Sequence, residues 1–144
     1  MAREQRAQAD QDLLLAAQSG DVDQVSALAT ATKVNLEDDR GVTALHAAVI
    51  GNQVAVVELL LARGADVHQR SANGRTALHN ACARSSPATV ELLLDAGSDL
   101  NCPAPADDAG GTSLTPLDFA LDWNRVEIAD LLRTRGAKTA RPRS

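Results

Sequence analysis

Aromatic side chains are almost absent from this sequence, which holds one Phe, one Trp and no Tyr among 144 residues. The core must therefore be packed with aliphatic side chains such as Leu, Val and Ala. No apolar run is long enough for a transmembrane helix, and the polar start of the chain does not resemble a secretory signal. The two cysteines lack the spacing of metal ligands, so we expect a reducing compartment, most simply the cytoplasm.

Motifs for catalysis are missing as well. The sequence contains no phosphate-binding loop, no nucleophile elbow and no Cys–His pair. Asp107 and Asp108 stand beside Gly110-Gly111, where solvated turn residues are a better interpretation than half of a metal site. We therefore expect no enzyme activity, no cofactor and no bound metal.

Positive charge is scarce except at the end of the chain. Residues 131–144 contain five basic residues and no acidic one, which leaves 9 basic against 19 acidic residues in 1–130. An acidic body repels phosphate groups, so we expect no nucleic-acid partner, and nothing in the sequence points to a membrane.

What the sequence does have is an internal repeat. The stretch Thr43–Ala48 (TALHAA) returns at 76–81 (TALHNA) and, more loosely, at 115–120 (TPLDFA). The first two copies start 33 residues apart and the next two 39 apart, which indicates a six-residue insertion. Each copy is followed by an apolar run and then by Gly64, Gly97 or Gly136. Such a period predicts a stack of similar units.

Local signals give each unit two helices. The first Thr of each copy can cap a helix, because its hydroxyl accepts from free N–H groups of the first turn. Pro116 suits the first helical position of the third copy, and each Gly suits the left-handed residue that ends a second helix. A turn-rich stretch such as 65–74 then links one helix pair to the next. One such pair cannot bury its apolar face alone, so the units must stack.

These motifs resemble those of the ankyrin-repeat family over residues 10–138. The matching segments are Gly-x-Thr-Ala-Leu-His and Leu-Leu-Leu-x-x-Gly-x-Asp, each present twice, at 41–46, 74–79, 59–66 and 92–99. The resemblance implies an all-α solenoid of four helix-turn-helix units with β-hairpin fingers, the outer two units being degenerate. We expect a flexible or helical extension at 1–9, repeats at 10–40, 41–73, 74–106 and 111–137, an inserted finger at 101–114 and a basic tail at 139–144.

Two histidines, His46 and His79, are the most tempting chemical groups. The resemblance implies a structural role instead, in which each imidazole bonds across the hairpin and fixes the start of a helix, with Asp118 at the third site. Cys82 occupies a small buried position. Cys102 lies on the insertion, where we expect it to be accessible and, without a basic neighbour, unreactive.

Trp123 aligns with Gly51 and Arg84, a position that lies on the concave side of ankyrin stacks. A Trp there could anchor a partner, since Trp is enriched among binding hot spots. Alternatively, the ring could lie over its own neighbours, with Arg84 stacked against it. Phe119 is expected in the core.

The resemblance implies protein recognition through the concave face. Carrying the register across the repeats gives the candidate partner-binding residues Arg40, Val42, Ile50, Arg70, Arg75, Arg84, Leu114, Asp122 and Trp123. Arg and aromatic side chains without Lys are typical of an interface, and the arginines would suit a partner with an acidic surface. We expect a monomeric adaptor or scaffold. Two alternatives stay open: an inhibitor or immunity protein that blocks an enzyme, and a substrate of an asparaginyl hydroxylase modified at Asn101.

Overall fold

The computed structural model of the chain describes residues 2–30, 32–105 and 113–139, with the backbone alone for residues 2–9. Within them, eight helices and two short strands follow one another: α1 (Ala2–Ser19), α2 (Val22–Leu28), α3 (Ala44–Ile50), α4 (Val54–Ala62), α5 (Ala77–Arg84), α6 (Pro87–Asp95), β1 (Ala104–Pro105), β2 (Ser113–Leu114), α7 (Pro116–Asp122) and α8 (Val126–Thr134). The expected helical extension at the N-terminus is the first part of α1.

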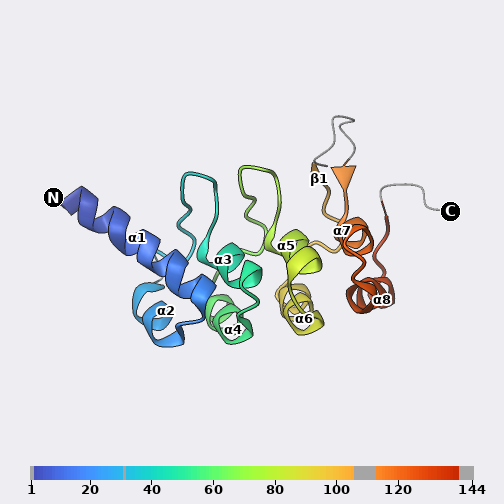
Figure 1. Cartoon of the computed structure of the whole chain (residues 1–144), viewed down its shortest axis with the longest axis horizontal. Coiled ribbons are helices and arrows are strands. Elements are labelled where there is room, and N and C mark those ends of the chain that lie inside the picture. The colour runs from blue at the N-terminus through green and yellow to red at the C-terminus, as the bar shows by residue number, and fades with distance from the viewer. Residues whose placement is uncertain (1, 31, 106–112, 140–144) are drawn as a thin grey trace.

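The helices form two rows (Figure 1). Helices α1, α3, α5 and α7 pack side by side in one row, and α2, α4, α6 and α8 form the second row beneath them. Loops between successive helix pairs project from the same side of the molecule as fingers. This is the expected all-α solenoid of four helix pairs. None of the described helices combines the length and the apolar character needed to cross a membrane.

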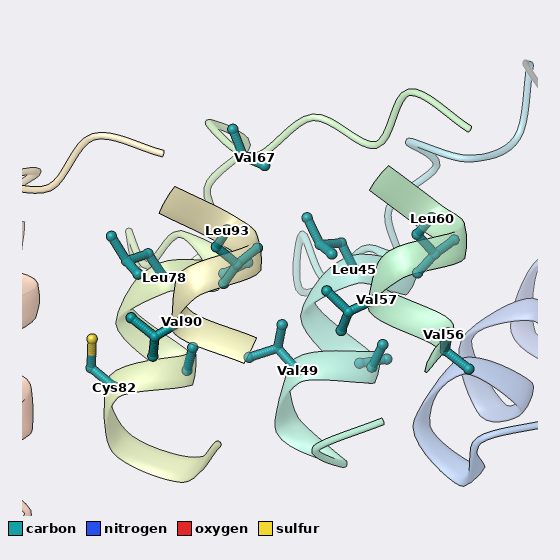
Figure 2. Packing of buried hydrophobic residues seen from close by; sticks show 14 of the residues in the cluster. Leu45, Val49, Val56, Val57, Leu60, Val67, Leu78, Cys82, Val90 and Leu93 are labelled. Carbon is teal, nitrogen blue, oxygen red and sulfur yellow. The ribbon is translucent and has the colours of Figure 1, made fainter. Parts of the chain in front are cut away.

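The core lies between the two rows and consists of aliphatic side chains (Figure 2). Leu45 and Leu78 of the first row pack against Leu60 and Leu93 of the second, and all four are essentially inaccessible to solvent. Cys82 is buried among them as a compact apolar residue, as expected, and burial raises the pKa of its thiol. Since each unit repeats the same contacts, the periodicity of the sequence becomes a continuous core.

Each helix of the first row, apart from α1, begins at a Thr that closes a capping box. The backbone N–H of Thr43 donates to His46 Nδ1 at 3.3 Å, and that of Thr76 donates to His79 Nδ1 at 3.1 Å. The other ring nitrogen of each His, Nε2, contacts a carbonyl oxygen of the next unit. His46 Nε2 lies 3.2 Å from the Arg75 carbonyl oxygen, and His79 Nε2 lies 2.8 Å from the Cys102 carbonyl oxygen. The structural role expected for both histidines is confirmed.

The fourth unit uses Asp118 in place of His. Its Oδ2 accepts the backbone N–H of Thr115 at 2.9 Å, so a carboxylate closes the same box. In the insertion ahead of this unit, β1 and β2 pair antiparallel with Ala104 opposite Leu114. Its tip, with Asp107, Asp108 and Gly110-Gly111, lies outside the described residues.

Two arginines fasten second-row helices to the preceding unit. Arg63, after α4, donates from Nη1 to the carbonyl oxygens of Ser26 and Ala29, each at 3.0 Å. Arg125, before α8, donates to the carbonyl oxygens of Ala83 and Ser85 at the end of α5. Carbonyls at helix ends have no partner inside their own helix, so these contacts satisfy acceptors and join neighbouring units.

Gly51 is required by a close approach and not by its conformation, since its φ is an ordinary −80°. A Cβ atom there would lie 2.3 Å from the Gln18 carbonyl oxygen in α1. We expect Gly51→Ala to push α1 away from α3 and to lower the free energy of unfolding by about 1–3 kcal/mol, measured by urea denaturation. Ala55→Ser, at an exposed position of α4, is the control and should stay within about 0.5 kcal/mol. An unchanged midpoint for Gly51→Ala would mean that the helices have room for a methyl group.

Candidate protein-binding face

The finger loops and the C-terminal ends of the first-row helices form one surface, which we call the concave face. A hollow of about 350 Å³ on this face lies between α3, α5 and the first two fingers. Three of its lining residues are the expected Arg40, Val42 and Ile50, joined by Ala72 and Asn80. The structure thus brings together three of the nine candidate residues around a half-apolar depression.

A second hollow of about 330 Å³ adjoins the first and shares Arg40 and Val42 with it. It extends the face over α1, where Leu14 and Leu15 line it, and Leu15 is 63% exposed. Both leucines are absent from the sequence-based candidates. The sequence could have indicated this exposure, because three consecutive residues of a helix point in directions about 100° apart and cannot all face inward.

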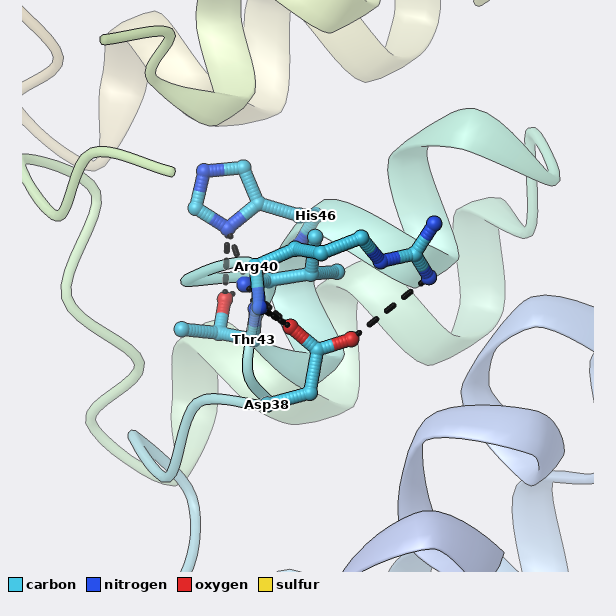
Figure 3. Close-up of polar contacts among 5 residues, drawn as sticks. Asp38, Arg40, Thr43 and His46 are labelled. Carbon is cyan, nitrogen blue, oxygen red and sulfur yellow. Dashed lines mark hydrogen bonds and ion pairs between the residues drawn. The ribbon is translucent and has the colours of Figure 1, made fainter. Parts of the chain in front are cut away.

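The tip of the first finger is held by Asp38 (Figure 3). Its Oδ1 accepts the backbone N–H of Arg40 at 2.8 Å and that of Val42 at 3.0 Å. Burial alone would raise the pKa of this carboxyl, but the two N–H groups and the Arg40 charge lower it. The Arg40 guanidinium lies 3.6 Å from Asp38 Oδ2 while its side chain stays 82% exposed. Arg40 can therefore still meet a partner.

Two of the four expected arginines are used within the chain. Arg70 donates from Nη1 to the Gly74 and Pro103 carbonyl oxygens, both at 2.7 Å, so it links the second finger to the third. Arg75 is half-buried, and its guanidinium lies 4.9 Å from the centre of the Phe119 ring. The alignment of the repeats places both residues on the finger correctly. It does not predict which groups their long side chains contact.

Leu114 was expected on the partner-binding face, and this expectation is wrong. It is only 6% exposed and belongs to the core, because its place opposite Ala104 in the hairpin turns the side chain inward. Phe119 is buried as expected and makes an edge contact with the His79 ring at 5.2 Å. The inserted finger is therefore anchored on the core of the third and fourth units.

In the fourth unit, Trp123 is 56% exposed at the end of α7. Arg84 and Asp122 are exposed too. The alternative of Arg84 stacked on the Trp123 ring is not found, since the one cation–π pair among the described residues joins Arg75 to Phe119. A large aromatic surface is thus open to solvent.

Cys102 differs from the expectation of an accessible thiol without a basic neighbour. It is 8% exposed, and Arg70 Nη2 lies 2.7 Å from its Sγ. Burial raises the pKa of the thiol and outweighs the opposing effect of Arg70, so the group is held as a thiol. In the part of the chain that the structure describes, no three His, Cys, Asp or Glu side chains gather as metal ligands would.

Comparison with known proteins agrees with this architecture. The chain matches the family described as "Ankyrin repeats (3 copies)" over residues 13–104 and again over 67–142. It is an ankyrin-repeat protein. Ankyrin repeats are modules of protein interaction and are typically not catalytic.

Two relatives match shorter segments of this ankyrin-repeat protein. It is 43% identical over 58 residues, 39% of this chain and 9% of the other, to the palmitoyltransferase akr1 of Schizosaccharomyces pombe. It is also 43% identical over 53 residues, 35% of this chain and 34% of the other, to protein phosphatase 1 regulatory subunit 27 of Mus musculus. The chain thus spans 9% and 34% of the length of these two relatives.

Proposed function

We propose that this ankyrin-repeat protein is a monomeric adaptor that grips another protein with its concave face. The observation that carries the proposal is the pair of adjoining hollows over α1, α3 and α5, in which the exposed Leu15 and the half-buried Val42 and Ile50 lie with Arg40. Exposed apolar groups with a polar rim are the usual composition of a binding surface.

Trp123 would be the anchor at the far end of this face. With Arg84 nearby, it suits a partner that offers an acidic group next to an apolar pocket. Of the four arginines first expected to contact acidic groups, Arg84 and Arg40 keep that role in the proposal, because Arg70 and Arg75 are held by contacts within the chain. The expected acidic character of the partner therefore rests on Arg40 and Arg84.

The test is capture of partners from a lysate with the wild type and with a Trp123→Ala, Arg84→Glu double variant. A protein retained by the wild type should bind the variant at least about 30-fold more weakly, since a Trp hot spot alone is worth about 2 kcal/mol or more. Glu58→Ala, on the exposed side of α4, is the matched control and should bind normally. Equal binding by the double variant would remove Trp123 and Arg84 from the interface.

A second candidate is a regulator that blocks or directs a partner enzyme. One of the relatives is named a regulatory subunit of a phosphatase. Such a regulator would bind its partner through the same face, but binding would change the activity of the partner enzyme. An activity assay on the captured partner, with and without the chain, separates the two: unchanged turnover favours the adaptor.

The third candidate is a substrate of an asparaginyl hydroxylase. Asn101 is exposed, and its Oδ1 accepts the backbone N–H of Lys138 at 2.8 Å. Asn35 occupies the same place two junctions earlier and accepts the N–H of Asp66 at 2.7 Å. A hydroxylase would have to draw either side chain out of this contact. Mass spectrometry of the native protein should show one added oxygen atom at Asn101 or Asn35, and its absence from both would end the idea.

A further inference from the structure

A groove of about 300 Å³ lies at the N-terminal end of the stack, between α1 and the loop of residues 36–39. We call it the N-terminal groove. Figure 1 shows the two segments that form it, the long first helix and the first finger beside it. The groove shares Leu14 and Asp38 with the hollow over α1 and so continues the concave face toward the first unit.

Its floor is apolar. Leu13 is buried, Leu14 is half-buried, and Leu36 is 39% exposed although it is a large aliphatic side chain. Leu15, on the adjoining hollow, is more exposed still. Covering such side chains contributes about 25 cal/mol for each Å² removed from water. An aliphatic side chain of a partner therefore has a surface to cover here.

Its walls are acidic, with four carboxylates at Asp10, Glu37, Asp38 and Asp39. Two cations stand near them: Lys33 lies 3.4 Å from Asp10, and Arg40 lies 3.6 Å from Asp38. Glu37 accepts a hydrogen bond from the neutral Gln69 amide at 2.8 Å, which leaves its charge in place. The groove thus keeps an excess of negative charge around an apolar floor.

We propose that the N-terminal groove binds a partner segment in which a Lys or Arg stands next to a large aliphatic side chain. The aliphatic group lies on Leu14 and Leu36, and the cation meets Glu37 and Asp39. This inference rests on the proposed function, because it assigns the chemistry of a partner to one end of the same face. An acidic segment is rejected at this end, since like charges brought together weaken a complex.

The proposal also gives the partner a direction along the stack. A cationic group belongs over the first unit, an apolar stretch over Val42 and Ile50, and an acidic group near Arg84. A segment laid the other way round would place each charge against its like. Because part of the attraction is between exposed charges, affinity should fall as salt is added.

The experiment uses a random peptide library displayed on phage and selected on the full chain. Selected peptides are synthesised, and their dissociation constants are measured by fluorescence anisotropy at low and at moderate salt. We expect enrichment of Lys or Arg beside Leu, Ile, Val or Met. Replacing that basic residue of the peptide with Glu should weaken binding at least 10-fold.

Three variants of the chain locate the site. Asp39→Lys and Leu36→Ser change exposed side chains of the groove, and each should weaken the selected peptides at least 10-fold. Glu91→Lys makes the same charge reversal on exposed α6 and is the matched control, expected to bind like the wild type. Circular dichroism of each variant shows that it is folded. Peptides that bind Asp39→Lys and the wild type alike would overturn the proposal.

The other outcomes separate this inference from the function on which it rests. Selected peptides that are acidic, and whose binding depends on Trp123 and Arg84, would overturn the groove proposal and leave the adaptor standing. A library that yields no binding peptide counts against both. Sedimentation of the chain alone tests whether a second copy of the chain occupies the groove. A dimer that Asp39→Lys abolishes would mean that the groove binds the basic tail of another copy. That result would overturn the proposal of a separate partner.

Discussion

Acidification should destabilise this ankyrin-repeat protein through its buried histidines, and through His79 above all. His79 is completely buried, and burial, as the largest cause, lowers its pKa from 6.5 to about 4. Between these values the unfolded chain takes up a proton that the folded chain does not. Stability is therefore complete above pH 6.5 and falls as the pH drops toward 4, by about 1.4 kcal/mol per pH unit and roughly 3 kcal/mol in all.

Hydrogen bonding explains why the folded chain resists the proton. Nδ1 of His79 accepts the backbone N–H of Thr76, so it cannot also carry a proton. Nε2 then holds the single ring proton and donates it to the Cys102 carbonyl oxygen at 2.8 Å. A second proton would cost the capping bond of α5 and bury a charge beside Arg75 and Arg70, whose charges also lower the pKa.

The variant that tests this is His79→Gln. Thr76 with Gln at 79 still has the sequence of a capping box, so the start of α5 can be kept while the titratable ring is lost. Urea unfolding at several pH values between 7.5 and 4.5 should show a clearly flatter profile for the variant than for the wild type. His46→Gln should flatten it as well, since burial lowers the pKa of His46 too.

An acid loss of the same size in His79→Gln would contradict the assignment. It would place the sensitivity in the carboxylates instead. Asp38 is the carboxylate to examine then, because its lowered pKa makes its contribution disappear only as the pH falls through the acidic range below 4. The two origins therefore differ in the pH at which stability is lost.

The fold itself was accessible from sequence because every unit repeats its local signals. Thr at a helix start, Gly at a helix end and Leu at fixed intervals depend on neighbours a few residues away, and three copies reinforce one another. Local chemistry and a period were sufficient for these features.

The candidate site was less accessible because exposure depends on contacts between units. Leu114 looked like a spare apolar residue, but a hairpin partner 10 positions away turns it into the core. Arg70 looked free, but Cys102 and Pro103, on the next finger, lie under its guanidinium. The repeat period predicts neither contact, because both involve the third finger, and the insertion makes that finger different from the other two.

The second prediction with a large expected effect also concerns a contact between neighbouring units. Arg125 stands at the start of α8, and its guanidinium donates to Ala83 and Ser85 carbonyl oxygens at the end of α5, the Ala83 contact being 3.1 Å long. The side chain is half-buried there. Carbonyls at a helix end carry partial negative charge, which favours a cation. We expect Arg125→Ala to lower the free energy of unfolding by about 2–3 kcal/mol, because it leaves two acceptors without a donor.

The loss should appear first in the fourth unit, which has a neighbour on one side only among the described residues. Hydrogen exchange of amides in α7 and α8 should therefore accelerate more than that in α3, while urea unfolding reports the total. Arg135→Ala is the matched control: its ion pair with Asp95, at 3.1 Å, lies at the surface, where such pairs contribute about 0–1 kcal/mol. If both variants shift the urea midpoint equally, the contacts of Arg125 with α5 do not hold the fourth unit in place. A selective acceleration in α7 and α8 would instead show that the exposed Trp123 depends on this arginine for its position, since both belong to the unit that Arg125 fastens.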